Sequence, residues 1–121
     1  MTARLQGQHV LITGAGGGIG LATAAAFVRE GAQCTVADIA ASPSAALAAL
    51  VAQHPAQLHY VGADVSKMDG VTAMVGAARA RFGTITVLFN NAALFDMAPL
   101  LESNEAMFDK LFAVNGKGAF F

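Results

Sequence analysis

A cluster of glycines follows a short apolar run close to the amino terminus. Residues 10–20 read Val-Leu-Ile-Thr-Gly-Ala-Gly-Gly-Gly-Ile-Gly, and an alanine-rich stretch comes next. This order predicts a strand, a tight loop and a helix. Glycines let the loop turn sharply and let a ligand approach the backbone without meeting a Cβ atom. The first N–H groups of a helix attract phosphate, so we expect the loop to bind a phosphate-bearing cofactor.

Polar side chains also follow the ends of the other apolar runs. Asp38 closes the run Cys-Thr-Val-Ala-Asp, about 20 residues after the glycines, where an acidic residue can bind the ribose of a nucleotide. Asp64 and Asn91 follow two later runs. Ligands of parallel α/β sheets bind beyond the carboxyl ends of the strands, where strand order reverses. We therefore expect Gly14, Asp38, Asp64 and Asn91 at one edge of a sheet.

Strand and helix patterns alternate along the chain, in the order βαβαβαβα. Strands are predicted at about 9–13, 33–38, 58–61 and 85–89, and helices at about 19–30, 42–54, 66–82 and from 103 onward. The expected caps of the last three helices are Ser42, Ser66 and Ser103. The alternation predicts an α/β fold with a doubly wound parallel sheet, strand order 3-2-1-4, between two layers of helices.

Helical spacing predicts which side chains face the core. One face of the first helix is expected to pack inward through Ile19, Ala22, Ala26 and Phe27. The apolar residues of the last helix spread over more than one face, which predicts burial on two sides: Met107, Phe108, Leu111, Phe112 and Val114.

Composition limits the class of protein. The chain has 121 residues, is 55% hydrophobic and 12% charged, and carries a net charge of −1. Without a basic cluster, nucleic acid and anionic membrane are poor candidates for partners, and the apolar excess predicts contact with another subunit. Cys34 is the one cysteine, which fits a reducing cytoplasm. Residues 1–8 lack an apolar core, so no signal peptide is expected, and neither a metal site nor a membrane span is predicted.

The pattern Thr13-Gly14-x-x-x-Gly18-Ile19-Gly20 resembles the short-chain dehydrogenase/reductase family. The resemblance covers essentially the whole chain and implies a Rossmann-like fold that binds a nicotinamide dinucleotide. Asn90-Asn91-Ala92-Ala93 is similar to the family's Asn-Asn-Ala-Gly, with Ala93 in place of the last glycine. Asn90 is expected to tie neighbouring strands together. The residues implied to bind the cofactor are Gly14, Gly17, Gly18, Ile19, Gly20, Asp38, Ile39, Asp64, Val65, Asn91, Ala92, Ala93 and Val114.

The acidic residues in this set have distinct expected partners. Asp38 would accept hydrogen bonds from the adenosine ribose hydroxyls, or could instead be a turn residue. A 2′-phosphate would face its carboxylate, and neither Ala15, Gly16 nor Ile39 is basic, so NAD is predicted over NADP. By resemblance, Asp64 accepts from the adenine amino group; the alternative is a helix-capping role.

Asn115 matches the helix asparagine of the family's catalytic Asn-Ser-Tyr-Lys tetrad, which holds a water that links the lysine to solvent. The alternative is a structural asparagine that hydrogen-bonds inside an apolar helix. The family's Tyr-x-x-x-Lys does not occur in the sequence, because Tyr60 is the one tyrosine and Asp64 stands four residues after it. We therefore expect residues 1–121 to be the NAD-binding amino-terminal half of a single domain whose carboxyl-terminal half is absent.

For the intact protein, the resemblance implies hydride transfer between NAD and a small alcohol or ketone substrate. Residues 90–99 look like the polyol branch, the sorbitol and galactitol dehydrogenases. A homodimer or homotetramer, paired through the last helix, is implied. Two alternatives remain: a non-catalytic NAD-binding fragment or regulatory module, and a methyltransferase, against which the glycine spacing and the asparagines argue.

Overall fold

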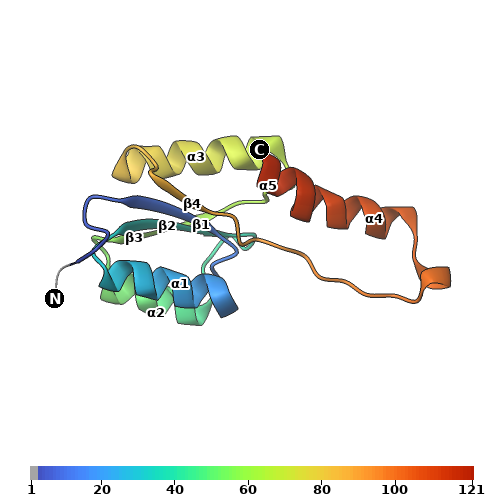
Figure 1. Cartoon of the computed structure of the whole chain (residues 1–121), viewed down its shortest axis with the longest axis horizontal. Coiled ribbons are helices and arrows are strands. Elements are labelled where there is room, and N and C mark those ends of the chain that lie inside the picture. Colours follow the sequence, from blue (N-terminus) through green and yellow to red (C-terminus); the bar gives the residue numbers. More distant parts are fainter. Residues whose placement is uncertain (1–2) are drawn as a thin grey trace.

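The computed structural model describes residues 3–121, in which four parallel strands form one sheet (Figure 1). The strands are β1 (His9–Thr13), β2 (Gln33–Asp38), β3 (Leu58–Gly62) and β4 (Val87–Phe89). Their order is β3-β2-β1-β4, and Val10 of β1 lies between Cys34 of β2 and Val87 of β4. The predicted order 3-2-1-4 is confirmed, and it places the reversal of strand order between β1 and β4.

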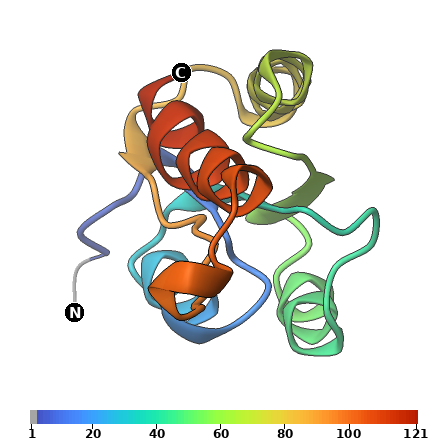
Figure 2. The ribbon, with the colours of Figure 1, turned by 90° about the vertical axis from the view of Figure 1, so that its right-hand side faces the viewer.

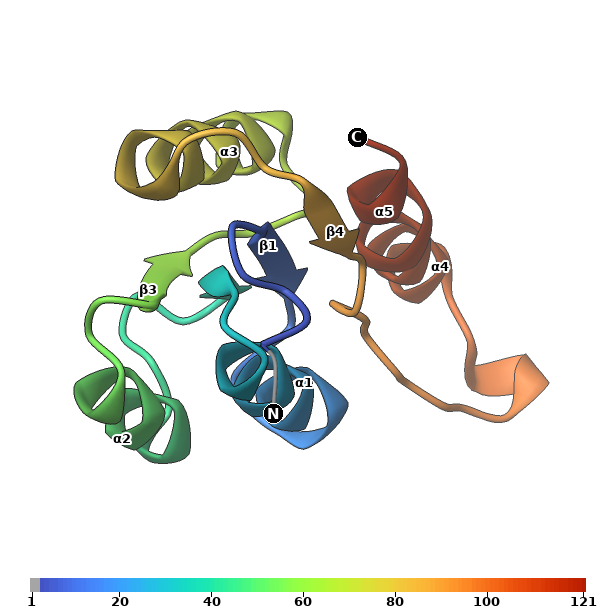
Figure 3. The same cartoon turned by 60° about the vertical axis from the view of Figure 1, so that its left-hand side comes forward.

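Helices cover both faces of the sheet. α1 (Gly18–Arg29) and α2 (Ala45–Gln53) lie on one face, and α3 (Met68–Phe82) lies on the other (Figures 1 and 3). This arrangement confirms the three-layer α/β/α architecture. The last part of the chain comprises the 3₁₀ turn η1 (Leu100–Glu102), α4 (Glu105–Phe112), the π-helical η2 (Ala113–Lys117) and α5 (Gly118–Phe120). Figure 2 shows α4 in front of the strand ends.

The central strands are apolar on both sides because both of their faces are covered. All residues of β1 are buried. Successive side chains of a strand point to opposite faces, and Val10 and Ile12 accordingly pack with Leu47 of α2, whereas Leu11 packs with Met74 of α3. The sheet thus separates two apolar clusters, and its carboxyl-end edge is the part that remains open to ligands.

The inward face predicted for α1 is correct only for Phe27, which packs against the core cluster. The buried residues of α1 are Gly20, Ala24 and Val28, whereas Ile19 is 72% exposed. The small residues at 20 and 24 let the helix lie close to the backbone of the β1 loop, and this close approach, rather than side-chain size, selects the buried face. In α2 the buried residue is Leu47.

Three helix starts differ from the predicted caps. Ser44 caps α2 in place of Ser42, Lys67 precedes α3 without a side-chain cap in place of Ser66, and Asn104 caps α4 in place of Ser103. The side-chain oxygen of a capping residue accepts a hydrogen bond from the backbone N–H group two or three residues after it. Ser44 Oγ accepts from the N–H of Leu47 at 3.3 Å, and Asn104 Oδ1 from that of Met107 at 2.9 Å.

The expected burial of the last helix on two sides is also wrong for residues 3–121. No residue of α4 is buried, and Phe108 and Phe112 are 59% and 62% exposed and stack on one another. β4 is the edge strand, with Leu88 56% exposed. Most of the large apolar side chains that are exposed in the described residues lie from β4 onward: in β4, in residues 95–101, in α4 and at residues 120 and 121.

Neither a membrane span nor a metal-ligand cluster is present in the described part of the chain. No helix within residues 3–121 combines the length and apolarity needed to cross a bilayer. The same residues contain no group of three or more histidine, cysteine or acidic side chains placed to hold a metal ion.

Cys34 should be chemically inert in the folded protein. Its side chain is fully buried in β2, and burial raises the pKa of its thiol to about 12. Because the thiolate is the reactive form, we expect no measurable reaction with an aromatic disulfide reagent at about pH 8. In denaturant the thiol should react fully, as absorbance of the released thiolate would show. Rapid labelling of the folded protein would contradict this burial.

Candidate cofactor-binding site

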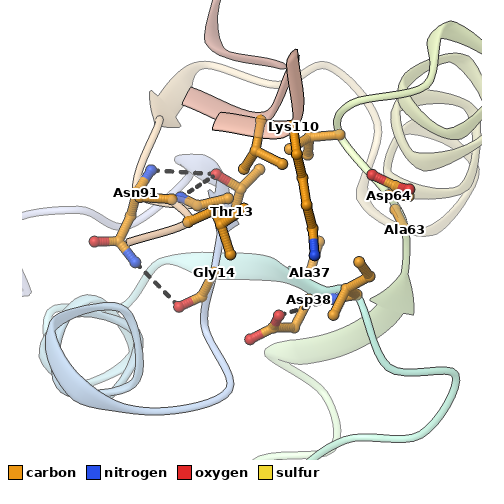
Figure 4. A pocket seen from close by; sticks show the side chains of 14 residues that line it. Thr13, Gly14, Ala37, Asp38, Ala63, Asp64, Asn91 and Lys110 are labelled. Atoms are coloured by element: carbon orange, nitrogen blue, oxygen red, sulfur yellow. Dashed lines mark hydrogen bonds between the residues drawn. The ribbon is translucent and has the colours of Figure 1, made fainter. Parts of the chain in front are cut away.

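A cavity of about 440 Å³ lies at the carboxyl ends of the strands, between the β-sheet and α4 (Figure 4). It is lined by Thr13, Gly14, Ala37, Asp38, Ile39, Ala63, Asp64, Val65, Asn91, Ala92, Ala93, Leu94, Lys110 and Val114. The loops after all the strands of the sheet therefore meet at this cavity, as the sequence predicted for Gly14, Asp38, Asp64 and Asn91.

The cavity contains most of the residues expected to bind the cofactor. Those that line it are Gly14, Asp38, Ile39, Asp64, Val65, Asn91, Ala92, Ala93 and Val114. Those that do not line it are Gly17, Gly18, Ile19 and Gly20, which lie at the start of α1. The lining residues that sequence reasoning missed are Thr13, Ala37, Ala63, Leu94 and Lys110. Each of them except Lys110 is next in sequence to a residue that was predicted, so their positions at the strand ends could have indicated them.

The glycine loop brings two backbone segments unusually close together. Gly14 has φ +69°, and a Cβ atom there would lie 2.8 Å from Ala92 Cα. A Cβ at Gly20 would lie 2.9 Å from Ala15 Cα and 2.7 Å from Asn91 Nδ2. These two glycines therefore allow the β1 loop, the β4 loop and α1 to pack together, and Gly20 acts in packing rather than in lining the cavity.

The start of α1 is open. A Cβ atom at Gly17 or Gly18 would meet nothing within 4 Å. Gly17 is the N-cap residue and supplies no side-chain cap, and the first turn contains no acidic residue. The first N–H groups of a helix lack partners inside the helix, so this end of α1 offers donors and a positive dipole end to an anion.

The Asp38 carboxylate is held by backbone donors on two sides. Its Oδ2 accepts from Gly16 N–H at 2.8 Å, and its Oδ1 accepts from Ile39 N–H at 2.7 Å. Each carboxylate oxygen has a further lone pair, so both can accept another hydrogen bond from a ligand. The contact with Gly16 ties the end of β2 to the glycine loop.

Two hydroxyl groups brace this arrangement from outside the cavity. Ser44 Oγ donates to the Gly16 carbonyl at 2.6 Å, so the residue that caps α2 also holds the glycine loop. The Tyr60 hydroxyl of β3 donates to the Ala40 carbonyl at 2.5 Å. The loop after Asp38 is thereby attached to both neighbouring segments.

Asp64 is partly occupied by its own turn. Its Oδ1 accepts from the N–H of Ser66 at 3.0 Å and from the Ser66 hydroxyl at 2.6 Å. These hydrogen bonds lower the pKa of the Asp64 carboxyl below its ordinary value. Asp64 therefore stabilises a turn with Ser66 and does not cap α3, which begins after Lys67. Its Oδ2 remains available to accept a hydrogen bond from a ligand. Next to it, Val65 packs against Gly118, where a Cβ would lie 2.8 Å from Val65 Cγ2.

Asn91, rather than Asn90, joins the ends of β1 and β4. Its N–H and that of Ala92 donate to Thr13 Oγ1 at 3.1 and 3.0 Å, and its Nδ2 donates to the Gly14 carbonyl at 3.0 Å. Asn90 Nδ2 instead donates to the Ala119 carbonyl at 3.2 Å. The expected strand-linking role therefore belongs to Asn91, because its side chain points toward β1.

Replacing Thr13 by valine should destabilise this junction. Thr13 is 4% exposed, and valine keeps its shape but leaves the N–H groups of Asn91 and Ala92 without their acceptor. An unpaired buried donor costs about 1–3 kcal/mol, and with some water access we expect a loss of about 2 kcal/mol in the free energy of unfolding. Urea unfolding would measure it. Thr13→Ser, which keeps the hydroxyl, is the control; equal losses in the two variants would contradict the assigned role.

Comparison with known proteins agrees with this geometry. The family model described as "short chain dehydrogenase" matches residues 8–121. The chain belongs to the short-chain dehydrogenase family. It is 42% identical over 118 residues to a sorbitol dehydrogenase of Cereibacter sphaeroides and equally to a galactitol 2-dehydrogenase of Agrobacterium fabrum. Each alignment covers 98% of this chain and 45% of the relative, so the chain spans about half the length of these relatives.

Solved structures of short-chain dehydrogenases superpose closely on the chain. A glucose/ribitol dehydrogenase-type structure from Brucella melitensis has a TM-score of 0.88 at 30% identity, covering 99% of this chain and 50% of that one. A 3-ketoacyl-(acyl-carrier-protein) reductase from Brucella melitensis, complexed with NADH, has a TM-score of 0.84 at 30% identity, covering 96% and 47%. The family assignment replaces the methyltransferase alternative.

Asn115, for which the sequence predicted a role in proton relay, binds the loop after β4. Its Oδ1 accepts from Leu94 N–H at 2.7 Å, and its Nδ2 donates to the Leu94 carbonyl at 2.8 Å. The prediction that this amide is buried is wrong: within the described residues, Asn115 is exposed and lies in the π-helical η2. The wider turn of η2 carries the side chain that clamps Leu94, a residue that lines the cavity.

Lys110 is the functional candidate that sequence reasoning missed. It extends from α4 into the cavity, with its amino group directed toward the ends of β1 and β2 (Figure 4). NAD was predicted because none of Ala15, Gly16 and Ile39 is basic, but Lys110 brings a cation to this end of the cavity from a distant part of the chain. Lys110 stands one helical turn before Val114, and residues four apart share a helix face; that spacing could have revealed it.

Proposed function

We propose that residues 1–121 are the NAD-binding amino-terminal half of a single short-chain dehydrogenase domain, and that the intact protein transfers hydride between a secondary alcohol and NAD. One observation carries the proposal: Gly14, Asp38, Asp64 and Asn91, far apart in sequence, line a single cavity at the carboxyl ends of the strands. Nicotinamide dinucleotides bind at this position in doubly wound sheets.

The residues present fit such a cofactor. The uncapped start of α1, with Gly17, Gly18 and Ile19, offers backbone donors to a pyrophosphate. Asp38 has lone pairs to accept from ribose hydroxyls, and Asp64 Oδ2 can accept from an adenine amino group. When bound, NAD supplies the hydride acceptor, while the protein supplies position and electrostatics.

We propose NAD as the preferred cofactor because Asp38 faces the ribose with a negative charge. Backbone donors hold its carboxylate in place on both sides, so it cannot easily move away from a 2′-phosphate. Like charges at close range disfavour binding, although a neighbouring cation reduces the penalty. The preference is therefore expected to be moderate, because Lys110 also lines the cavity.

The substrate and the assembly belong to the same proposal. A polyol is the first substrate class to test, since relatives named for sorbitol and galactitol are 42% identical over 118 residues. Asn115 would support the proton relay of the intact site while its amide positions Leu94. The exposed aromatic side chains of α4, Phe108 and Phe112, would be covered in a homodimer or homotetramer. We place the protein in the cytoplasm.

The direct test is to assay the intact protein, and the 121-residue chain beside it, for NADH binding and for oxidation of secondary alcohols. Calorimetric titration measures the binding, and the absorbance of NADH measures the oxidation. The proposal expects the intact protein to bind NADH and to oxidise an alcohol, and the isolated chain to oxidise none at an ordinary rate. An intact protein that binds no NADH would overturn it.

A second candidate is a module that binds NAD without catalysis. It is favoured by the position of Tyr60, the one tyrosine of the chain, whose hydroxyl is bonded to the Ala40 carbonyl and which is not followed by lysine at the fourth position. The mass of the intact protein separates the candidates. A protein of about this chain's mass, 12.3 kDa, that binds NADH would establish the module.

A further inference from the structure

Lys110 gives the cavity a positive charge opposite two negative ones. Of the described residues that line it, Asp38 and Asp64 are acidic and Lys110 is the one that is basic. The carboxylates come from the ends of β2 and β3, whereas Lys110 reaches in from α4 on the other side of the cavity (Figure 4). A ligand in this space would lie between them.

The lysine has no charged partner on its own helix that could explain this orientation. Side chains three and four residues apart are neighbours on a helix surface, and around Lys110 these positions hold Ala106, Met107, Ala113 and Val114. Within residues 3–121 the ion pair of the structure is Arg4–Glu30, far from the cavity. The amino group of Lys110 is therefore available to a ligand.

The charge balance of the site indicates which ligand group it would meet. A dinucleotide has a doubly negative pyrophosphate, and Asp38 and Asp64 oppose the entry of such an anion. The α1 terminus offsets part of this repulsion through its dipole. Lysine is a common phosphate ligand and acts as a point charge.

We propose that Lys110 is a phosphate-binding residue of this site, which pairs with a phosphate group of the bound dinucleotide and holds α4 over it. This rests on the proposed function. The phosphate is either the pyrophosphate, which NAD and NADP share, or the 2′-phosphate of NADP. A bound ligand shields the pair from water, so the interaction is stronger than that of an exposed ion pair.

The test compares adenosine ligands that carry no phosphate, a pyrophosphate, or a pyrophosphate and a 2′-phosphate. The intact protein is titrated with adenosine, ADP-ribose and 2′-phospho-ADP-ribose in the wild type and in Lys110→Met, which keeps the length of the side chain without its charge. Lys110→Arg retains the charge. Lys117→Met is the matched control, because Lys117 is exposed on η2 and does not line the cavity.

For Lys110→Met we expect the Kd of ADP-ribose to rise about tenfold at low salt, with adenosine changed less than about twofold. The loss should shrink at high salt, and Lys110→Arg should recover most of the affinity. A loss confined to 2′-phospho-ADP-ribose would assign the contact to the 2′-phosphate and would also support the proposal.

Two results would overturn the role of Lys110 while leaving the proposed function intact: unchanged affinity for both phosphorylated ligands in Lys110→Met, or an equal loss in Lys117→Met. If the wild type binds neither ADP-ribose nor NADH, the proposed function fails and the role of Lys110 fails with it. The two failures are thus distinguishable in one set of titrations.

Discussion

Replacing Gly14 by alanine should lower the free energy of unfolding by about 4 kcal/mol, since backbone strain and overpacking each cost about 1–3 kcal/mol. Gly14 has φ +69°, and the added Cβ would lie 2.8 Å from Ala92 Cα and 3.0 Å from Ala92 N. Backbone atoms cannot rotate away as a flexible side chain can. The loops after β1 and β4 would have to separate, which opens the cavity and should abolish NADH binding.

Gly7→Ala is the matched control for this experiment. Gly7 also has a positive φ, +83°, but a Cβ there would meet nothing within 4 Å. It should therefore show the strain alone, about 1 kcal/mol. Urea unfolding followed by circular dichroism measures both variants. If Gly14→Ala cost no more than Gly7→Ala, the close approach of the two loops would be refuted.

Replacing Asp38 by alanine should raise the Kd of NADH about 100-fold, close to 3 kcal/mol by the usual conversion. The variant loses the proposed acceptor for the ribose hydroxyls and also the anchor for Gly16 N–H and Ile39 N–H. NADPH should lose less affinity, because the repulsion of its 2′-phosphate disappears together with the carboxylate. Fluorescence titration with both cofactors measures the change in their ratio.

Ser44→Ala separates the two effects of the Asp38 substitution. It removes the hydrogen bond that Ser44 Oγ donates to Gly16 and leaves the carboxylate in place. A loosened loop should weaken NADH and NADPH by a similar factor, below about tenfold for one neutral hydrogen bond. An Asp38→Ala variant that folds and binds NADH as well as the wild type would exclude Asp38 from the site.

Local patterns predicted the elements of the fold well. The predicted ranges of β1 and β2 match the structure, because each is a short apolar run that ends at a glycine turn or an acidic residue. Helix starts were predicted less well, since only the fold decides which polar side chain, if any, reaches an N–H group of the first turn. Ser44, for example, is placed where its hydroxyl also meets Gly16.

In the site, too, some features could be predicted from local patterns and others depended on the fold. Gly14, Asp38, Asp64 and Asn91 could be predicted because the ends of parallel strands share one edge of the sheet. The buried face of α1 could not be predicted in this way, because it depends on how close Gly20 comes to the β1 loop. The exposure of α4 could not be predicted either, because it depends on which segments pack against the helix. Within residues 3–121, Phe108 and Phe112 remain exposed.

By itself, the sequence determined the alternation of strands and helices and the edge at which a cofactor would lie, because these follow from patterns within about 20 residues. The order of the strands followed from the general rules for parallel α/β sheets. Only the tertiary structure decided how the site is held together and charged. Asp38 is fixed by Gly16, Asn115 binds Leu94, and Lys110 reaches the strand ends. These contacts join segments that are distant in the chain, so they depend on the packing of helices and loops around the sheet, which no local pattern encodes.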